Sequence, residues 1–190
     1  MYNKKVCILG AGGVGKSSLI QRFLSGGFDE VCQTNVGAKI DKIVVDVDRD
    51  KVQLMLWDIQ GEDRVSPGFL NYLKGASAII YVVDGTRLET LGTAMEYRQE
   101  TEKYFGCAKP SMMLFNKADL AKQWEISSVM ISDVETVGLF AMLTSCLEGS
   151  GVHTAFNLIT RIMMGKTALM PVMTVPPSLG NDDAGMQSRF

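Results

Sequence analysis

Few features of the sequence point to a metal centre, a membrane or a nucleic acid. It has one histidine and four widely spaced cysteines without a C-x-x-C pair, so neither a zinc site nor a disulfide framework is indicated. No apolar run approaches the length of a bilayer span, and the first residues lack the pattern of a secretion signal. Lysine and arginine total 19 against 21 aspartates and glutamates, and this net charge of −2 argues against a nucleic-acid partner. We therefore expect a cytoplasmic protein with reduced thiols.

Glycine is the residue in excess, with 19 among 190 residues against a usual share of about 7%. The length suits a single domain with a real core. Short apolar runs bounded by turn signals alternate with longer amphipathic stretches, which is typical of βαβ units and a mainly parallel sheet. The expected strands are 4–9, 38–47, 51–57, 77–83, 110–115 and 139–144, and the expected helices are 16–25, 63–74, 87–105, 127–136 and 150–164.

Two regions refine this outline. The run 38–47 is followed by Asp48-Arg49-Asp50, so its simplest partner is 51–57, in an antiparallel hairpin at a sheet edge. After Gly165 the pattern stops, and several prolines and glycines make the remaining residues poor core builders. We expect one domain over 1–166 and a C-terminal tail over 167–190 that is flexible or docked.

A phosphate-binding motif follows the first strand. The segment from Gly10 to Ser17 matches G-x-x-x-x-G-K-[ST] and lies between an expected strand and an expected helix. Its glycines let backbone N–H groups turn inward around phosphate oxygens, and the helix N-terminus adds partial positive charge. Lys16 would reach the β- and γ-phosphates, and Ser17 would give its hydroxyl oxygen to Mg²⁺. The predicted phosphate-binding residues are Gly12, Gly13, Val14, Gly15, Lys16, Ser17 and Ser18.

A second motif indicates which base is bound. Asn116, Lys117 and Asp119 form an N-K-x-D sequence directly after the apolar strand 110–115, where parallel sheets bind their ligands. A carboxylate accepts two N–H donors side by side, which guanine supplies and adenine does not. Together with the phosphate loop, this motif favours a guanine nucleotide over the adenine nucleotide of a P-loop kinase or ATPase.

With both motifs in place, the chain resembles the Ras superfamily of small GTPases, and most of all its Rab branch. The segment from Trp57 to Gly61 is similar to the family's W-D-x-A-G motif, and Thr144-Ser-Cys146 is a variant of its T-S-A-K loop. The resemblance covers about residues 4–164. It implies a P-loop NTPase of the Ras-like three-layer α/β class, with a six-stranded, mostly parallel sheet and one antiparallel edge hairpin. It also implies binding of GTP and GDP with Mg²⁺.

The resemblance assigns further roles residue by residue. Asp58 would hold Mg²⁺ through a water, and Gly61 would offer its backbone N–H to the γ-phosphate. Phe28 would stack on the guanine, while Ser145 and Cys146 would meet the base from the far side. Leu147 stands where the family has lysine, so one contact to the base or ribose is in question.

The first switch loop departs from the family. A gap-free register puts Asn35 where the family has a threonine that places its hydroxyl on Mg²⁺, with Thr34 one position early. Either Asn35 supplies its amide oxygen to the metal, or the loop slips by one residue and presents Thr34. We favour Asn35, because Val36 and Gly37 then stay in register.

The second switch loop departs as well. Glu62 stands where the family has its catalytic glutamine, and Gln60 replaces the small residue before Gly61. A carboxylate only accepts hydrogen bonds and adds negative charge beside a polyanion, so we expect a weak GTP hydrolase. An ordinary acidic residue in a first helical turn is an equal alternative for Glu62. The residues assigned to hydrolysis are Glu62, Gln60 and Lys16.

These features predict a small GTP-binding protein that acts as a nucleotide-dependent switch and hydrolyses GTP slowly. The alternative is a guanine-nucleotide-binding interaction module with little or no hydrolysis. Effector, exchange-factor or activating proteins are expected to bind through residues 28–40 and 60–74. The sequence has no cysteine after Cys146, so we expect no self-encoded lipid anchor and membrane association only through partners.

Overall fold

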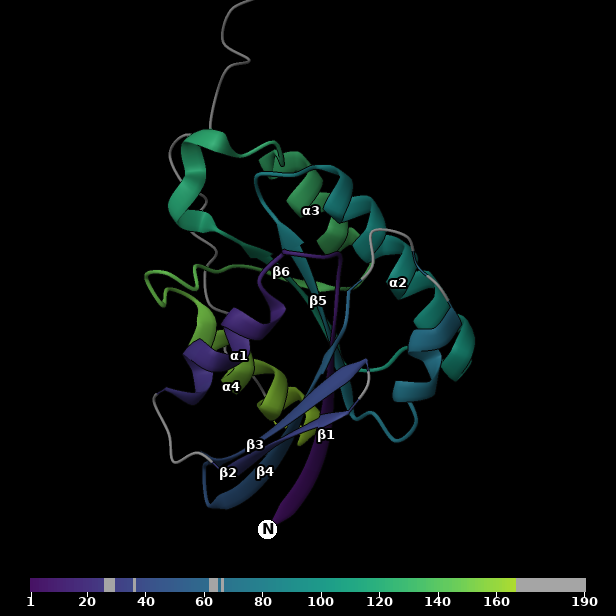
Figure 1. The fold of residues 1–190 in the computed structure, drawn as a ribbon, viewed down its shortest axis with the longest axis vertical. Coiled ribbons are helices and arrows are strands. Elements are labelled where there is room, and N and C mark those ends of the chain that lie inside the picture. Colours follow the sequence, from purple (N-terminus) through teal and green to yellow (C-terminus); the bar gives the residue numbers. More distant parts are fainter. Residues whose placement is uncertain (26–29, 36, 62–64, 66, 167–190) are drawn as a thin grey trace, which may run out of the picture.

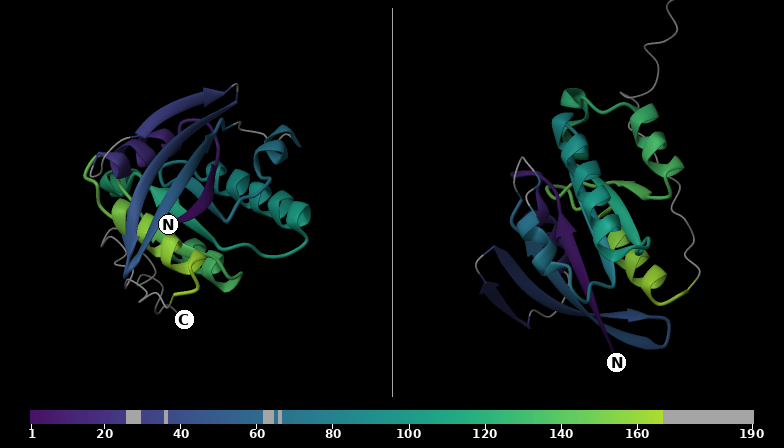
Figure 2. Two further views of the ribbon diagram at one scale, coloured as in Figure 1. Left: turned by 90° about the horizontal axis from the view of Figure 1, so that it is seen from below. Right: turned by 90° about the vertical axis from the view of Figure 1, so that its right-hand side faces the viewer.

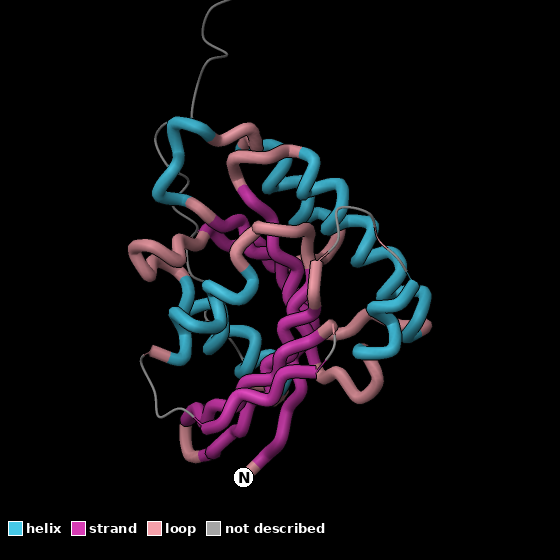
Figure 3. Tube along the Cα trace, in the orientation of Figure 1, coloured by secondary structure: helices cyan, strands magenta, loops and turns pink. Residues whose placement is uncertain are grey.

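The computed structural model describes residues 1–25, 30–35, 37–61, 65 and 67–166, with residues 30–35 described by their backbone alone. Its centre is a seven-stranded sheet with the order β2-β3-β4-β1-β5-β6-β7 (Figures 1 and 3). Strands β4, β1, β5, β6 and β7 are parallel, whereas β3 is antiparallel to both β4 and β2. The strands are β1 (Tyr2–Leu9), β2 (Glu30–Asn35), β3 (Ala38–Val47), β4 (Asp50–Ile59), β5 (Ala78–Asp84), β6 (Ser111–Asn116) and β7 (Phe140–Leu143).

Helices cover both faces of this sheet and make a three-layer molecule (Figure 2). Helices α1 (Lys16–Leu24) and α4 (Val152–Met163) share one apolar core with the sheet, where Phe23 stacks on Phe156 at 4.3 Å between ring centroids. Helices α2 (Glu89–Phe105) and α3 (Ser128–Thr136) share the other core. Every residue of β5 is buried, as expected for a central parallel strand with helices on both faces. None of the described helices has the length and apolar character that crossing a bilayer requires.

The predicted Ras-like α/β class is confirmed, and all six predicted strands are present. The seventh strand, β2, was not predicted. It pairs with β3 on the side away from β4, so the predicted 38–47/51–57 hairpin forms but does not lie at the sheet edge. The polar stretch 30–35 has no apolar alternation, and its strand form comes from hydrogen bonding to a neighbour rather than from its own pattern.

The predicted helix 63–74 is corrected. Residues 67–72 form the 3₁₀ segment η1 (Pro67–Tyr72), and residues 65, 73 and 74 are not helical. Residues 63, 64 and 66 lie outside the described residues. Pro67 has no N–H to give to an α-helix, and Gly68 has low helix propensity, so both oppose a continuous helix here. A second 3₁₀ segment, η2 (Ala118–Gln123), follows β6.

The turn of the β3–β4 hairpin is tied to the end of α4. The Lys166 ammonium lies 2.8 Å from an Asp50 carboxylate oxygen and 3.1 Å from an Asp48 carboxylate oxygen, and it donates to the Val47 carbonyl at 2.9 Å. Arg161 adds an ion pair to Asp48 at 2.9 Å. The predicted tail, 167–190, lies outside the described residues.

Candidate functional site

The phosphate loop joins β1 to α1 through glycines in conformations that other residues avoid. Gly15 has φ +101°, and a Cβ atom there would lie 2.3 Å from the Asn116 amide nitrogen. Gly10 has φ +149°, and a Cβ atom there would lie 2.4 Å from the Val82 carbonyl oxygen. Both positions therefore require glycine, because of the backbone conformation and because neighbouring groups leave no space for a side chain.

Lys16 is held inside this loop. Its side chain is buried, and its Nζ donates to the carbonyls of Gly10 at 2.9 Å and Ala11 at 2.8 Å. The turn after β4 lies directly against the same place, since a Cβ atom on Gly61 would come within 2.3 Å of Lys16 Nζ. The fold thus brings the predicted γ-phosphate contact of Gly61 to the lysine that is expected to bind the same phosphate.

Ser17 and Asp58 form the candidate Mg²⁺ site. The Ser17 hydroxyl, in the first turn of α1, donates to an Asp58 carboxylate oxygen near the end of β4. A hydroxyl and a carboxylate in contact supply the hard oxygen ligands that Mg²⁺ takes, usually together with water and substrate phosphates. The residues present therefore fit the metal that was predicted from sequence.

A cavity of about 490 Å³ opens beside these groups. The phosphate loop, the first turn of α1, the start of β3 and the end of β4 all contribute to its walls. The lining residues are Gly12, Gly13, Lys16, Ser17, Gly37, Ala38, Lys39, Asp58, Gln60 and Gly61. The predicted catalytic residue Gln60 is exposed on this wall, and its backbone N–H donates to the Gly37 carbonyl at 2.9 Å.

Four predicted residues cannot be placed at the level of their side chains. Phe28 and Glu62 lie outside the described residues. Thr34 and Asn35 belong to β2, where their backbones pair with Lys39 and Ala38, but the description there stops at the backbone. The choice between Thr34 and Asn35 as a metal ligand stays a prediction. Ser18 is exposed on the first turn of α1.

Asn116 connects three loops at the end of β6. Its buried side chain donates from Nδ2 to the Val14 carbonyl at 2.9 Å, and its Oδ1 accepts from the Thr144 hydroxyl at 3.3 Å. The Cys146 thiol also donates to Asn116 Oδ1 at 3.4 Å. Asn116 therefore holds the predicted base loops against the phosphate loop.

Asp119 and Ser145 meet where the guanine is expected. The buried Ser145 hydroxyl donates to an Asp119 carboxylate oxygen at 2.5 Å. Arg22 of α1 donates to the Cys146 carbonyl at 2.8 Å and to the Leu147 carbonyl, so the base loop is also attached to α1. Burial raises the pKa of the Cys146 thiol, which stays neutral.

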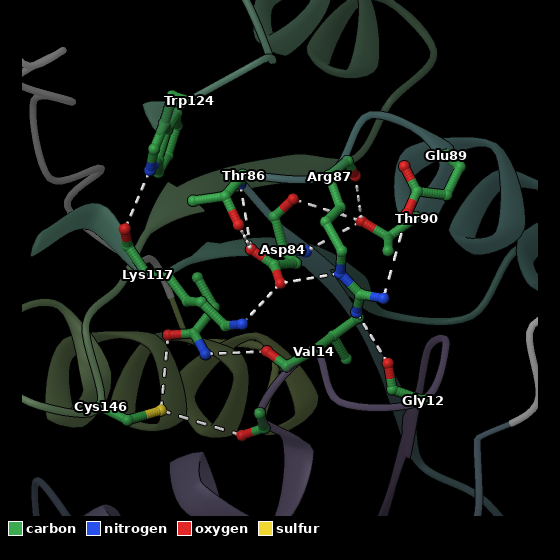
Figure 4. Close-up of polar contacts among 12 residues, drawn as sticks. Gly12, Val14, Asp84, Thr86, Arg87, Glu89, Thr90, Lys117, Trp124 and Cys146 are labelled. Carbon is green, nitrogen blue, oxygen red and sulfur yellow. Dashed lines mark hydrogen bonds and ion pairs between the residues drawn. The ribbon is translucent and has the colours of Figure 1, made fainter. Parts of the chain in front are cut away.

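Sequence reasoning gave no role to the carboxylate that organises the centre of this edge, Asp84, the last residue of β5 (Figure 4). Its fully buried side chain receives Lys117 Nζ at 2.6 Å and Arg87 Nε at 3.0 Å on one oxygen. The backbone and hydroxyl of Thr86 donate to the other oxygen at 3.0 and 2.7 Å. Burial raises the pKa of Asp84, but the hydrogen bonds from Lys117, Thr86 and Arg87 outweigh it, so the pKa lies below its ordinary value.

The position of Asp84 carried a signal that sequence reasoning could have used. A carboxylate that ends a wholly apolar strand sits at the edge where parallel sheets bind ligands. Through Lys117 it touches the N-K-x-D loop, whose lysine adopts φ +66° and accepts on its carbonyl from the Trp124 indole N–H at 2.9 Å. The described site residues thus form one continuous band along the carboxyl ends of the parallel strands.

The similarity to known proteins extends over all the described site residues. The model of the Ras family matches residues 5–165. Similar proteins include the Ras-related protein Rab-19 of Homo sapiens, 31% identical over 173 residues that span 88% of this chain and 78% of the relative. Ras-related protein Rab-4 of Dictyostelium discoideum is 30% identical over 87% of this chain and 82% of its own length. Ras-related protein Rab5 of Nicotiana tabacum is 34% identical over 84% and 80%, respectively.

Proposed function

Because the chain belongs to the Ras family, near its Rab branch, it is a small GTP-binding protein of the switch type, and we propose that it binds nucleotide with Mg²⁺ and hydrolyses GTP slowly. The observation that carries the proposal is the convergence of Lys16, Ser17 and Asp58 on one cavity. A lysine, a hydroxyl and a carboxylate beside a glycine-rich helix start are the groups that a triphosphate and its metal need.

Each of these groups has a distinct task in the proposed reaction. Lys16 neutralises charge on the β- and γ-phosphates, and Gly61 supplies a backbone N–H to the γ-phosphate. Ser17 would hold the metal through its hydroxyl and Asp58 through a water, and the metal would supply charge stabilisation at the phosphates. These residues orient the reacting phosphate without forming a covalent bond to it.

Guanine specificity is assigned to Asp119. Its carboxylate accepts from the guanine N1 and 2-amino groups, a pair that adenine does not present. The 2.5 Å hydrogen bond from Ser145 fixes one carboxylate oxygen and so limits how the carboxylate can turn. The Ser145 and Cys146 backbones complete the base site from the opposite side.

Slow hydrolysis is proposed from the chemistry of position 62. A glutamine amide can accept from the attacking water while donating toward the phosphoryl group, whereas the Glu62 carboxylate can only accept. Its charge also opposes the negative charge of the transferring group. Gln60 offers an amide on the cavity wall, two positions earlier in the chain.

Single-turnover hydrolysis of bound GTP tests this proposal. We expect Glu62→Gln to hydrolyse GTP about ten-fold faster or more, because one placed hydrogen-bonding group typically contributes at least that factor. Glu100→Gln makes the same exchange on helix α2, where Glu100 pairs with Lys103, and serves as the matched control that should leave the rate unchanged. Gln60→Ala tests separately whether Gln60 takes part in the reaction. Equal rates for the wild-type protein and Glu62→Gln would refute the proposed cause of slow hydrolysis.

Limited proteolysis tests the switch. A glutamate-specific protease can cut at Glu30, within the 28–37 segment, and the proposal expects different cutting rates in the GTP- and GDP-bound protein. Tight nucleotide binding with neither hydrolysis nor a difference in cutting would support an interaction module instead.

Partners are proposed to bind through residues 28–40 and 60–74. The described part of this surface contains a second cavity of about 280 Å³. It lies between the end of β4, η1 and α2, and its lining includes Gly37, Gln60, Phe69, Tyr72 and Tyr97. A cytoplasmic location is proposed as well, and the free thiols of Cys7, Cys107 and Cys146 support it.

A further inference from the structure

Arg87 reaches from the base side of the site to the phosphate loop. It lies between β5 and α2, and its Nε is 3.0 Å from Asp84 Oδ2. Its Nη2 donates to the Gly12 carbonyl at 2.7 Å, and the same nitrogen lies 3.7 Å from where a Cβ atom of Gly13 would be (Figure 4). One guanidinium group therefore connects a buried carboxylate to the peptide between Gly12 and Gly13.

We propose that Arg87 is a positioning residue that fixes the orientation of the Gly12–Gly13 peptide for the β- and γ-phosphates. The proposal rests on the proposed function, since it concerns the same nucleotide site. Arg87 itself acts through the backbone of the loop and belongs to no motif that identified the site.

The geometry of a peptide bond explains how this works. In a trans peptide the carbonyl of one residue and the N–H of the next point in opposite directions. The described residues contain no cis peptide, so a donor that holds the Gly12 carbonyl on one side aims the Gly13 N–H to the other side. Gly12 and Gly13 both line the cavity proposed to hold the phosphates.

This loop needs such a fixed point because glycine does not hold its own conformation. Gly13 has φ +72°, and a peptide between two glycines can rotate at little steric cost. Inward-pointing N–H groups bind phosphate only when they are aligned beforehand. A charge-assisted hydrogen bond to the carbonyl supplies this alignment.

The guanidinium is itself held in place. Asp84 is fully buried and is also paired with Lys117 at 2.6 Å, so the carboxylate that orients Arg87 cannot turn freely. Arg87 Nη1 lies 3.9 Å from Glu89, and the Arg87 side chain is 36% exposed. Because the side chain is partly exposed, replacing Arg87 should not leave a cavity in the core.

The test compares nucleotides that differ only in phosphate number. We expect Arg87→Ala to weaken the binding of GDP and GTP by about ten-fold or more, the usual effect of losing one hydrogen bond to a charged group. The binding of GMP should change by less than about two-fold, because GMP has no β- or γ-phosphate for the Gly13 N–H to meet. Dissociation constants are measured on the full chain with Mg²⁺, by displacement of a fluorescent GDP.

Arg98 provides a matched control. Its Nε pairs with Glu102 at 2.9 Å and its Nη2 donates to the Val137 carbonyl at 2.8 Å, so it repeats the contacts of Arg87 away from the nucleotide site. Arg98→Ala should leave the affinities for all three nucleotides unchanged. Arg87→Lys, which keeps the charge but cannot span both partners, should show a smaller loss that again depends on phosphate number.

The outcomes separate the inference from the proposed function. The wild-type protein reports on the proposed function, which fails if neither GDP nor GTP binds. If wild type binds both, an equal loss for GMP, GDP and GTP in Arg87→Ala, or no loss at all, overturns the positioning role. If Arg87→Ala does not fold, the same comparison is made with Arg87→Lys and decides the question by the same criterion.

Discussion

Replacing Asp84 by asparagine should reveal how much the buried carboxylate stabilises the fold. Asp84 accepts from Lys117, Arg87 and Thr86 while having no exposed surface. Asparagine has nearly the same shape, but its NH₂ group would face one of these donors and its charge would be lost. The substitution therefore tests the electrostatic network with little change in packing.

The magnitude follows from the exposure of the partners. Removing one member of a buried ion pair costs about 3–5 kcal/mol when the remaining charge stays buried. The side chains of Lys117 and Arg87 are 34% and 36% exposed, so water can hydrate both cations in Asp84→Asn. We therefore expect a smaller loss, about 2 kcal/mol at pH 7, which lowers the unfolding midpoint of a domain of this size by about 4–8 °C.

The pH dependence gives the sharper test. The pKa of Asp84 is lowered in the folded state, so its contribution is present above the unfolded-state pKa of about 3.9 and is lost as the pH falls toward the folded-state value. Unfolding of the wild-type protein and Asp84→Asn is followed by circular dichroism between pH 7 and pH 3. Their free energies of unfolding should differ at pH 7, and the difference should shrink as the pH falls below about 4. A difference that stays constant over this range, or no difference at pH 7, would refute the reasoning.

Three further predictions follow from described contacts. Gly15→Ala should abolish nucleotide binding in equilibrium titrations, because its Cβ would lie 2.3 Å from the Asn116 amide at φ +101°; undiminished binding would contradict this. Iodoacetamide should modify exposed Cys107 rapidly and buried Cys7 hardly at all, as measured by peptide mass spectrometry. Bound GDP should slow the modification of Cys146, and equal labelling of Cys146 with and without GDP would count against the base site. Burial raises the pKa of Cys7 to about 12, so the stability that the neutral thiol contributes is lost as the pH rises above about 9. The free energy of unfolding should therefore fall less between pH 9 and pH 12 in Cys7→Ala than in the wild-type protein.

The sequence predicts the parts of the site that depend on local geometry. The phosphate loop follows from its spacing, since Gly10 and Gly15 need backbone conformations that are set within a few residues. The same holds for the N-K-x-D segment at the end of β6, because an apolar strand followed by polar residues places its ligands at a known edge.

Features that depend on distant contacts were missed. Residues 30–35 form a strand because they pair with β3, and their sequence has no alternation of apolar and polar residues that would predict a strand. The sequence predicts a helix over residues 63–74, although Pro67, inside that range, opposes a helix that continues through it. Arg87 meets Gly12 across 75 positions of sequence, so no local pattern could connect them.

The ion pairs of Lys166 with Asp48 and Asp50 fix where the described part of the domain ends. Residue 166 lies beside Asp48 and Asp50, at the opposite end of the hairpin from Ala38 and Ile59 next to the phosphate cavity. Nine residue steps along β3 separate the two ends by about 30 Å. A surface, label or fused protein joined after residue 166 would begin at the end of the domain remote from the nucleotide, so tethered protein should exchange nucleotide at the same rate as free protein.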